Sequence, residues 1–482
     1  MVAVRCGAAL AVALSISAAT ASAGMHRYST GGTAPLVTAL ADPGLFNSSQ
    51  EARAFAMTRA AGATYVRLSA VWGAIAPDTP PTGFVATDPT SKGYSWGAMN
   101  AAVEAANGAG LTPMLDIVGT TPSWAYAKLP DPPNGGTPRA AALADFATAL
   151  ATHFNGNTPG VPAVHVYQVW NEPNLSIDLS PVKASTYRGM VNAASDAIHK
   201  VDAANVVVAG GLEPVAHKKV RAHKWYSTKP LDFMRSFLCL SKGAHPHATC
   251  HDSVRFDVWA HHPYTHGGPF GKAKIAGDVM LGDLPRMRSL LKAGVRLHRV
   301  ISSRPVRFWV TEFGWDTNPP RPNAASLSLA ARWTAESLYQ MWRSVVSLVT
   351  WFLLVDYPSP SPFQSGLYFE ARSLILARPK PTLRAFRFPF VAYLRGHSVS
   401  VWGRDATSNA QVVTIQLRHG RTGRWRRVAS VGSNSVGIFR ANVSLKASRK
   451  DWLRARVPGS GTSLAFSLTV PKTPPHIGPW GY

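Results

Sequence analysis

The chain has 482 residues, of which 46% are hydrophobic, and it carries 50 Lys and Arg against 25 Asp and Glu, a formal net charge of +25. This length is sufficient for one large barrel with an accessory module, and the composition excludes a disordered or collagen-like chain. The basic balance favours polyanionic partners, but it also serves to keep an exported protein soluble, so charge alone selects no ligand.

Residues 1–23 have the layout of a secretory signal peptide. Arg5 precedes a short apolar run, and small residues then lead to Ala23, after which we expect cleavage. The apolar run is too short to span a bilayer, and no later segment has the roughly 20 apolar residues that a span requires. We therefore expect a secreted, extracellular protein without a transmembrane segment.

Past this leader, β-branched or aromatic runs alternate with helical patterns. Strands are predicted over residues 35–41, 63–72, 111–119, 164–174, 205–214, 256–264, 306–315 and 348–357. Helices are predicted over residues 48–62, 96–110, 137–154, 180–202, 283–300 and 327–345. This order predicts an α/β protein with a (β/α)8 TIM barrel over residues 24–387. A doubly wound sheet is the main alternative, but the glycine-rich turn that usually follows its first strand is missing.

Two cysteines, Cys239 and Cys250, lie close together between the fifth and sixth predicted strands. In an exported chain such a pair favours a disulfide that closes a small loop. Nearby histidines at positions 245, 247 and 251 would permit a zinc site instead, but their spacing fits no standard ligand pattern. We predict the disulfide, and we expect neither a metal nor a cofactor.

The pattern changes after residue 387. Residues 388–471 contain short alternating runs separated by Gly, Ser and Asn turns, which predicts a small β-sandwich, and residues 472–482 form a tail. The only acidic residues of the predicted sandwich are Asp405 and Asp451, against many arginines. This domain is therefore either a binding module for carbohydrate or an anionic envelope polymer, or a stabilising appendage.

Two glutamates occupy equivalent places in the predicted barrel. Glu172 follows the fourth strand and Glu312 ends the seventh. Active sites of such barrels lie at the carboxyl ends of the strands, so both carboxylates are expected at one mouth. A pair of carboxylates is what glycoside hydrolysis requires, one to protonate the leaving oxygen and one to attack the sugar or activate water.

The motifs WNEPN (170–174) and TEFGW (311–315) resemble the acid/base and nucleophile motifs of the clan A retaining glycoside hydrolases. The cellulase-like family 5 and family 39, which includes β-xylosidases, are the most similar families. The resemblance covers roughly residues 35–387. It implies a glycosidase that hydrolyses O-glycosyl compounds, with Glu172 as acid/base, Glu312 as nucleophile and Asn171 as the hydrogen-bond partner of a sugar 2-hydroxyl.

Further residues match the supporting positions of this clan. Arg67 in YVRLS would bind the nucleophile carboxylate and keep it ionised. In HHPY, Tyr264 would hold the nucleophile and His262 would contact the sugar or Glu172. Trp351 in VTWFLL would form the floor on which a sugar ring stacks. We also predict that the two catalytic carboxyl groups lie about 5–5.5 Å apart, with pKa values pushed apart by their surroundings.

Several questions stay open at this level. Glu213 adds a third carboxylate at the mouth, where it either contacts substrate or pairs with His217 or Lys218. A β-linked glucan, mannan or xyloside all fit as the oligo- or polysaccharide substrate. The alternative to an enzyme is a non-catalytic carbohydrate- or envelope-binding protein on a barrel scaffold. We expect no nucleic-acid partner, because the arginines form no recognised motif, and we expect a monomer.

Overall fold

The structure is a computed structural model that describes residues 35–471, except 219–223, 406, 408–409 and 460. The expected signal peptide (1–23) and tail (472–482) lie outside the described residues. In the part of the chain that is described, no helix has the length and apolar character needed to cross a bilayer.

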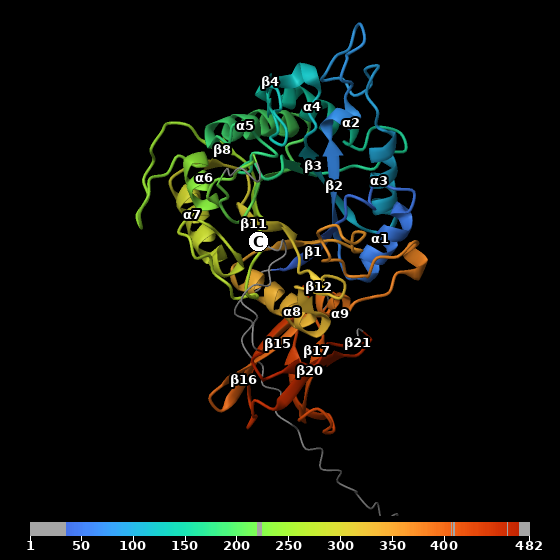
Figure 1. Cartoon of the computed structure of the whole chain (residues 1–482), viewed down its shortest axis with the longest axis vertical. Coiled ribbons are helices and arrows are strands. Elements are labelled where there is room, and N and C mark those ends of the chain that lie inside the picture. Colours follow the sequence, from blue (N-terminus) through green and yellow to red (C-terminus); the bar gives the residue numbers. More distant parts are fainter. Residues whose placement is uncertain (1–34, 219–223, 406, 408–409, 460, 472–482) are drawn as a thin grey trace, which may run out of the picture.

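Eight parallel strands close into a barrel in the order β1-β14-β11-β9-β7-β6-β3-β2, which confirms the predicted fold class (Figure 1). Each barrel strand corresponds to one of the eight runs predicted from the sequence. Their bounds are β1 Val37–Ala41, β2 Tyr65–Val71, β3 Thr112–Val118, β6 Val166–Val169, β7 Val206–Leu212, β9 Val258–His261, β11 Arg307–Phe313 and β14 Leu348–Phe352.

Helices surround this barrel and connect its strands (Figure 1). Their bounds are α1 Glu51–Ala60, α2 Trp72–Ile75, α3 Gly97–Gly108, α4 Ala140–His153, α5 Ala184–Val201, α6 Pro230–Phe237, α7 Leu284–Arg296, α8 Leu327–Arg343 and α9 Pro381–Arg387. Short strands pair within the connecting segments: β4 Tyr126–Lys128 with β5 Thr137–Pro138, β8 Val254–Arg255 with β10 Val300–Ile301, and β12 Thr317–Asn318 with β13 Ala325–Ser326.

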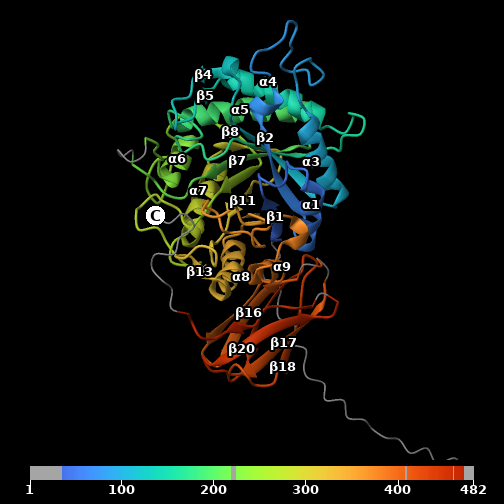
Figure 2. The ribbon, with the colours of Figure 1, turned by 45° about the vertical axis from the view of Figure 1, so that its right-hand side comes forward.

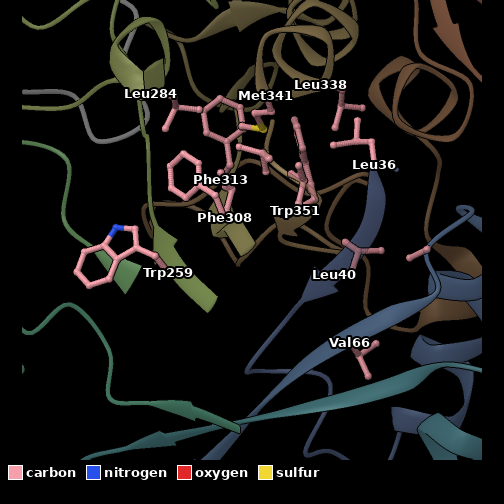
Figure 3. Close-up of a cluster of buried hydrophobic side chains, with 14 of the residues drawn as sticks. Leu36, Leu40, Val66, Trp259, Leu284, Phe308, Phe313, Leu338, Met341 and Trp351 are labelled. Atoms are coloured by element: carbon pink, nitrogen blue, oxygen red, sulfur yellow. The ribbon is translucent and has the colours of Figure 1, made fainter. Parts of the chain in front are cut away.

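Side chains along each barrel strand point alternately to its two faces, and this produces two separate apolar layers. One layer fills the barrel interior, where successive inward positions of the strands meet: Ala39, Met114, Val166, Val206, Val208, Val258, Ala260, Trp309 and Leu348. The other layer lies between the barrel and its helices, and Figure 3 shows part of it around Trp259, Phe308 and Trp351. Because side chains alternate with period two, the layer to which one residue belongs fixes the direction of its neighbours.

Two strands interrupt this alternation with one additional residue each. In β7 the register against β9 shifts between Gly210 and Leu212, and in β11 the register against β14 shifts between Val310 and Phe313. A bulge of this kind re-aims the side chains that follow it. Both bulges lie near the carboxyl ends of their strands, immediately before or at the predicted site residues.

The C-terminal region forms two antiparallel sheets that pack against the barrel at α8 and α9 (Figure 2). The three-stranded sheet has the order β15-β16-β19, and the five-stranded sheet has the order β18-β17-β20-β21, with β22 also on β20. The bounds are β15 Phe390–Arg395, β16 Ser398–Arg404, β17 Val412–His419, β18 Arg426–Gly432, β19 Ile438–Ser444, β20 Asp451–Val457, β21 Gly461–Thr462 and β22 Phe466–Ser467.

Cys239 and Cys250 form the predicted disulfide, with Cα atoms 5.5 Å apart. The two sulfurs are bonded to each other, so the zinc site that the neighbouring histidines would have permitted is not formed here. Nearby, the Nδ1 atom of His247 lies 3.0 Å from the hydroxyl of Ser241.

Gly210 offers a test of the β7 bulge. Its φ is +99°, and an added Cβ would lie 2.3 Å from the carbonyl oxygen of Ala260 on β9. We therefore predict that Gly210→Ala destabilises the fold by about 2 kcal/mol or more, because both the backbone conformation and the contact with β9 exclude a side chain.

Thermal denaturation followed by circular dichroism measures this effect. Gly189→Ala in α5 is the matched control, since no atom lies within 4 Å of a Cβ added there and its φ is not positive. The control should keep or slightly raise the Tm. Equal Tm values for the two variants would contradict the role assigned to the bulge.

Candidate active site

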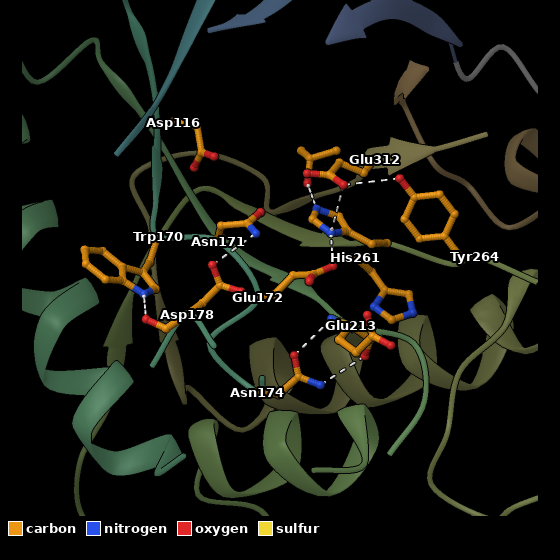
Figure 4. A network of polar contacts seen from close by, with 12 residues as sticks. Asp116, Trp170, Asn171, Glu172, Asn174, Asp178, Glu213, His261, Tyr264 and Glu312 are labelled. Carbon is orange, nitrogen blue, oxygen red and sulfur yellow. Dashed lines mark hydrogen bonds and ion pairs between the residues drawn. The ribbon is translucent and has the colours of Figure 1, made fainter. Parts of the chain in front are cut away.

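Polar side chains from several strands meet at the carboxyl end of the barrel (Figure 4). The sequence-predicted residues Arg67, Asn171, Glu172, His262, Tyr264 and Glu312 are all brought together there, through the contacts described below. They come from β2, β11 and the segments that follow β6 and β9.

Glu172 reaches the site because the chain turns sharply after β6. Trp170 has a φ of 71° and Glu172 a φ of 34°, backbone angles that residues other than glycine rarely adopt. The indole N–H of Trp170 donates to the carbonyl of Asp178 at 2.9 Å, and the N–H of Glu172 donates to the carbonyl of Gly211 at 3.1 Å. These bonds hold a backbone conformation that would otherwise be unfavourable.

Glu312 is held by two donors, one from β2 and one from the segment that follows β9. Arg67 donates from Nη1 to Glu312 Oε1 at 2.7 Å, and the hydroxyl of Tyr264 donates to Oε2 at 3.2 Å. Its carboxylate therefore has a donor on each oxygen, which fixes its orientation.

Arg67 also binds Asp116 and Asn171. Its Nη2 donates to a carboxylate oxygen of Asp116 and, at 2.9 Å, to the side-chain oxygen of Asn171. Burial alone would lower the pKa of Arg67, but the carboxylates of Asp116 and Glu312 raise it, so the guanidinium stays charged. Burial raises the pKa of Asp116 to about 8, despite the opposing charge of Arg67.

His262 lies between the two glutamates. Its Nδ1 is 2.7 Å from Glu172 Oε1 and 3.8 Å from Glu312 Oε2, and its Nε2 is 3.1 Å from the hydroxyl of Thr311. Burial, followed by the charge of Arg67, holds the pKa of His262 well below its usual range. A neutral imidazole can therefore bind Glu172 and Thr311, one through each ring nitrogen, without adding a positive charge beside the glutamates.

The surroundings of Glu172 favour its protonated form. Burial is the main reason that its pKa lies well above the usual carboxyl range, and the nearby carboxylates of Glu213, Glu312 and Asp178 add to the effect. A carboxyl group kept protonated near neutral pH is suited to act as an acid.

The two glutamates and His262 form a compact group. One oxygen of each carboxylate and one nitrogen of His262 all lie within 4.8 Å of one another. These three residues could also ligate a metal ion, but the carboxylate of Glu312 already forms an ion pair with Arg67. The two carboxyl groups therefore approach each other closely, and their separation of about 5–5.5 Å stays a prediction.

Glu213 belongs to the same mouth. Its Oε1 lies 3.3 Å from His217 Nε2, as the pairing alternative predicted. Its backbone is fixed by Asn174, whose side chain donates to the Glu213 carbonyl at 3.0 Å and accepts from its N–H at 2.9 Å. Burial raises the pKa of Glu213 as well.

The prediction that Trp351 forms a sugar-binding floor is wrong. Its side chain is 0% exposed, its indole N–H donates to the Ser365 carbonyl at 2.8 Å, and its ring packs edge-on against Phe313 and Phe386. Since Leu348 of the same strand points into the barrel, alternation turns Trp351 outward into the layer beneath the helices. A fully enclosed ring has no face on which a sugar could stack.

The structure also adds residues that the sequence analysis missed: Asp116, Asn174, Asp178 and Thr311. Asp116 could have been found, because it stands two residues after the inward-facing Met114 on β3. Asp178 could not, since it lies in a loop and reaches Asn171 Nδ2, at 3.5 Å, only through the fold.

A protein-family model matches residues 22–265, and its description is cellulase, glycosyl hydrolase family 5. The match covers half of the chain, so this protein belongs to glycosyl hydrolase family 5. It is therefore a glycosidase, and its substrate is a carbohydrate.

Solved structures show the same fold at low sequence identity. A family 39 (GH39) enzyme from Xanthomonas axonopodis pv. citri is 15% identical, with 88% of this chain and 97% of that chain covered and a TM-score of 0.50. A monomeric beta-xylosidase from Caulobacter crescentus CB15 is also 15% identical, with 87% and 94% covered and a TM-score of 0.50. A search of curated proteins found no match.

The corrected position of Trp351 can be tested by Trp351→Phe. This variant should lower the Tm, because it leaves a cavity and removes the bond to Ser365, at a cost of about 1–3 kcal/mol. The KM for an aryl glycoside should stay within about twofold of the wild-type value, since no substrate contact is lost. A large rise in KM at an unchanged Tm would restore the stacking role.

Proposed function

We propose that the chain is a secreted retaining glycosidase that cleaves a β-linked saccharide by double displacement. Glu312 is the nucleophile and Glu172 the general acid/base. The observation that supports the proposal is the difference between the surroundings of two neighbouring glutamates. Glu312 has two donors, one of them the charged Arg67, whereas Glu172 is buried among carboxylates that favour its protonated form.

In the first step, a carboxylate oxygen of Glu312 attacks the anomeric carbon while the bond to the leaving oxygen breaks. Glu172 transfers its proton to that oxygen, so the aglycone leaves as a neutral alcohol. The sugar is then an ester of Glu312, and Glu172 is ionised. Tyr264 and Arg67 support this step by holding the attacking carboxylate in one orientation.

In the second step, Glu172 takes a proton from water, and the resulting hydroxide attacks the anomeric carbon. The ester bond breaks, which frees Glu312 and restores the proton on Glu172. Two inversions leave the anomeric configuration unchanged. Loss of the Glu312 charge in the intermediate lowers the pKa of Glu172, because that charge is one cause of its elevation.

A secreted location is part of the proposal and rests on the layout of residues 1–23. The Cys239–Cys250 disulfide supports it, since disulfides persist in oxidising compartments. A screen of the purified protein against aryl β-glycosides and β-linked polysaccharides would identify the sugar.

The two catalytic roles are separated by azide rescue. Glu172→Ala should lose on the order of 10²-fold or more activity on poor leaving groups but still react with a dinitrophenyl β-glycoside, which needs little protonation. That variant should stall as a glycosyl-enzyme, and azide should release it as a β-glycosyl azide. Glu312→Ala should abolish hydrolysis of every substrate.

Product configuration is read by proton NMR, and the covalent intermediate by intact-protein mass spectrometry. Glu104→Ala, a change at an exposed glutamate of α3, is the control and should retain full activity. An α-azide from the Glu172 variant, with the β-azide appearing only for Glu312→Ala, would reverse the assignment.

The pH profile should report the acid form of Glu172. The protonated group is the active form, so kcat/KM falls as pH rises through its pKa, well above the usual carboxyl range. Because the Glu213 carboxylate helps to raise that pKa, Glu213→Gln should move the alkaline limb to lower pH. If kcat/KM of Glu213→Gln fell at the same alkaline pH as that of the wild-type protein, the fall could not be assigned to Glu172.

A further inference from the structure

The outward face of the five-stranded sheet gathers basic and aromatic side chains. Along β17, Val413, Ile415 and Leu417 are fully buried between the two sheets, so the intervening positions point outward. Cross-strand pairing adds residues of β18 and β20 to the same face. These outward positions, together with Trp425, which directly precedes β18, make up what we term the arginine face: Thr414, Gln416, Arg418, Trp425, Arg427, Ser430, Trp452, Arg454 and Arg456.

No carboxylate of the described residues forms an ion pair with the four arginines of this face. The two acidic residues of the sandwich are both buried and engaged elsewhere. Asp451 accepts from the N–H of Ser448 and lies 2.7 Å from His419 Nδ1, and Asp405 accepts from Thr407. Among the residues that the structure describes, the positive charge of the face is therefore not neutralised by an ion pair.

Two of the four guanidinium groups, those of Arg418 and Arg454, stack on tryptophan, and Arg427 donates from Nη2 to the hydroxyl of Ser430 at 2.7 Å. The Cζ atoms of Arg418 and Arg454 lie 4.7 Å and 4.2 Å from the ring centroid of Trp425, and Arg418 is 5.5 Å from that of Trp452. Arg454 also donates from Nε to Gln416 at 2.8 Å. Stacking uses the flat side of a guanidinium and leaves its edge N–H groups available for a bidentate acceptor.

Like charges crowd this surface. Burial and then the positive charges of Arg418, Arg384 and Arg456 lower the pKa of Arg454. Arg384 belongs to α9 and donates to the carbonyl of Thr462 in β21, so it extends the basic surface to the barrel edge. Grouped cations at fixed positions cost repulsion, which an anionic ligand relieves.

We propose that the arginine face is a binding site for a carboxylate-bearing polysaccharide, separate from the barrel mouth. Carboxylates match the fork of the stacked guanidinium groups, while Gln416, Thr414 and Ser430 offer hydrogen-bond partners for sugar hydroxyls. An open sheet face suits a chain rather than a small anion. A polysaccharide is favoured over nucleic acid because the same chain carries a glycosidase barrel.

Binding is measured by affinity electrophoresis and isothermal titration calorimetry of the full-length protein, with polygalacturonate as the probe. Methyl-esterified polygalacturonate has the same sugar chain without the charge, and single-stranded DNA has charge without the sugar. The proposal expects binding to polygalacturonate that weakens as salt rises, and at least about tenfold weaker binding to the ester and to DNA.

The variant pair Arg427→Gln with Arg456→Gln tests the face itself. Both side chains are exposed, so the protein should fold and should keep its activity on small soluble glycosides. Binding to polygalacturonate should weaken by about tenfold. The control, Lys292→Gln with Arg296→Gln on α7, removes the same charge from another exposed surface and should change binding by less than about twofold.

Four results would overturn the proposal, and the first three are no binding of the wild-type protein, equal losses in the two variant pairs, and equal affinity for the methyl ester. DNA binding as tight as that of polygalacturonate would refute a polysaccharide site in favour of a general polyanion surface. Binding needs no turnover, so each of these outcomes leaves the catalytic proposal standing or falling on its own tests.

Discussion

The guanidinium of Arg67 is the interaction on which the active site depends. It acts on four carboxyl groups, those of Asp116, Glu172, Asp178 and Glu312, and Glu213 adds a fifth carboxyl group to the same barrel mouth. Buried charges of one sign repel strongly, and one cation cannot balance five anions. The arrangement is stable only if several of these groups keep their protons.

The raised pKa values show how that condition is met. Burial raises the pKa values of Asp116 and of Asp178 to about 8, and Glu172 and Glu213 are shifted in the same direction. Direct contact with the Arg67 guanidinium distinguishes Glu312 from Glu172, because the hydrogen bond at 2.7 Å goes to Glu312. Glu172 and Glu312 have identical side chains, and they differ chemically because, of the two, Arg67 binds only Glu312.

Periodicity made much of this molecule predictable. All eight barrel strands and the two glutamate motifs could be found from apolar runs that end in polar residues. Asp116 could also have been found by counting in steps of two from Met114, and the same count from Leu348 would have excluded Trp351 as a sugar platform. The sequence pattern could not predict the places where this periodicity is broken. The β11 bulge brings the consecutive residues Thr311 and Glu312 to one site, and Trp170 turns at a φ of 71°, against its own preference.

The contact between α8 and the sandwich has a further consequence for the barrel. Arg332 of α8 donates to the Ser467 carbonyl at 2.8 Å, and Tyr339 and Trp342 pack their rings within 6 Å of Trp402 in β16. This helix follows β11, the strand that carries Glu312. A barrel expressed without residues 388–471 would expose these aromatic rings on the helix behind its nucleophile. The barrel and the sandwich thus share one hydrophobic interface. Exchanging the sandwich between related enzymes would therefore require matching changes in the side chains of α8.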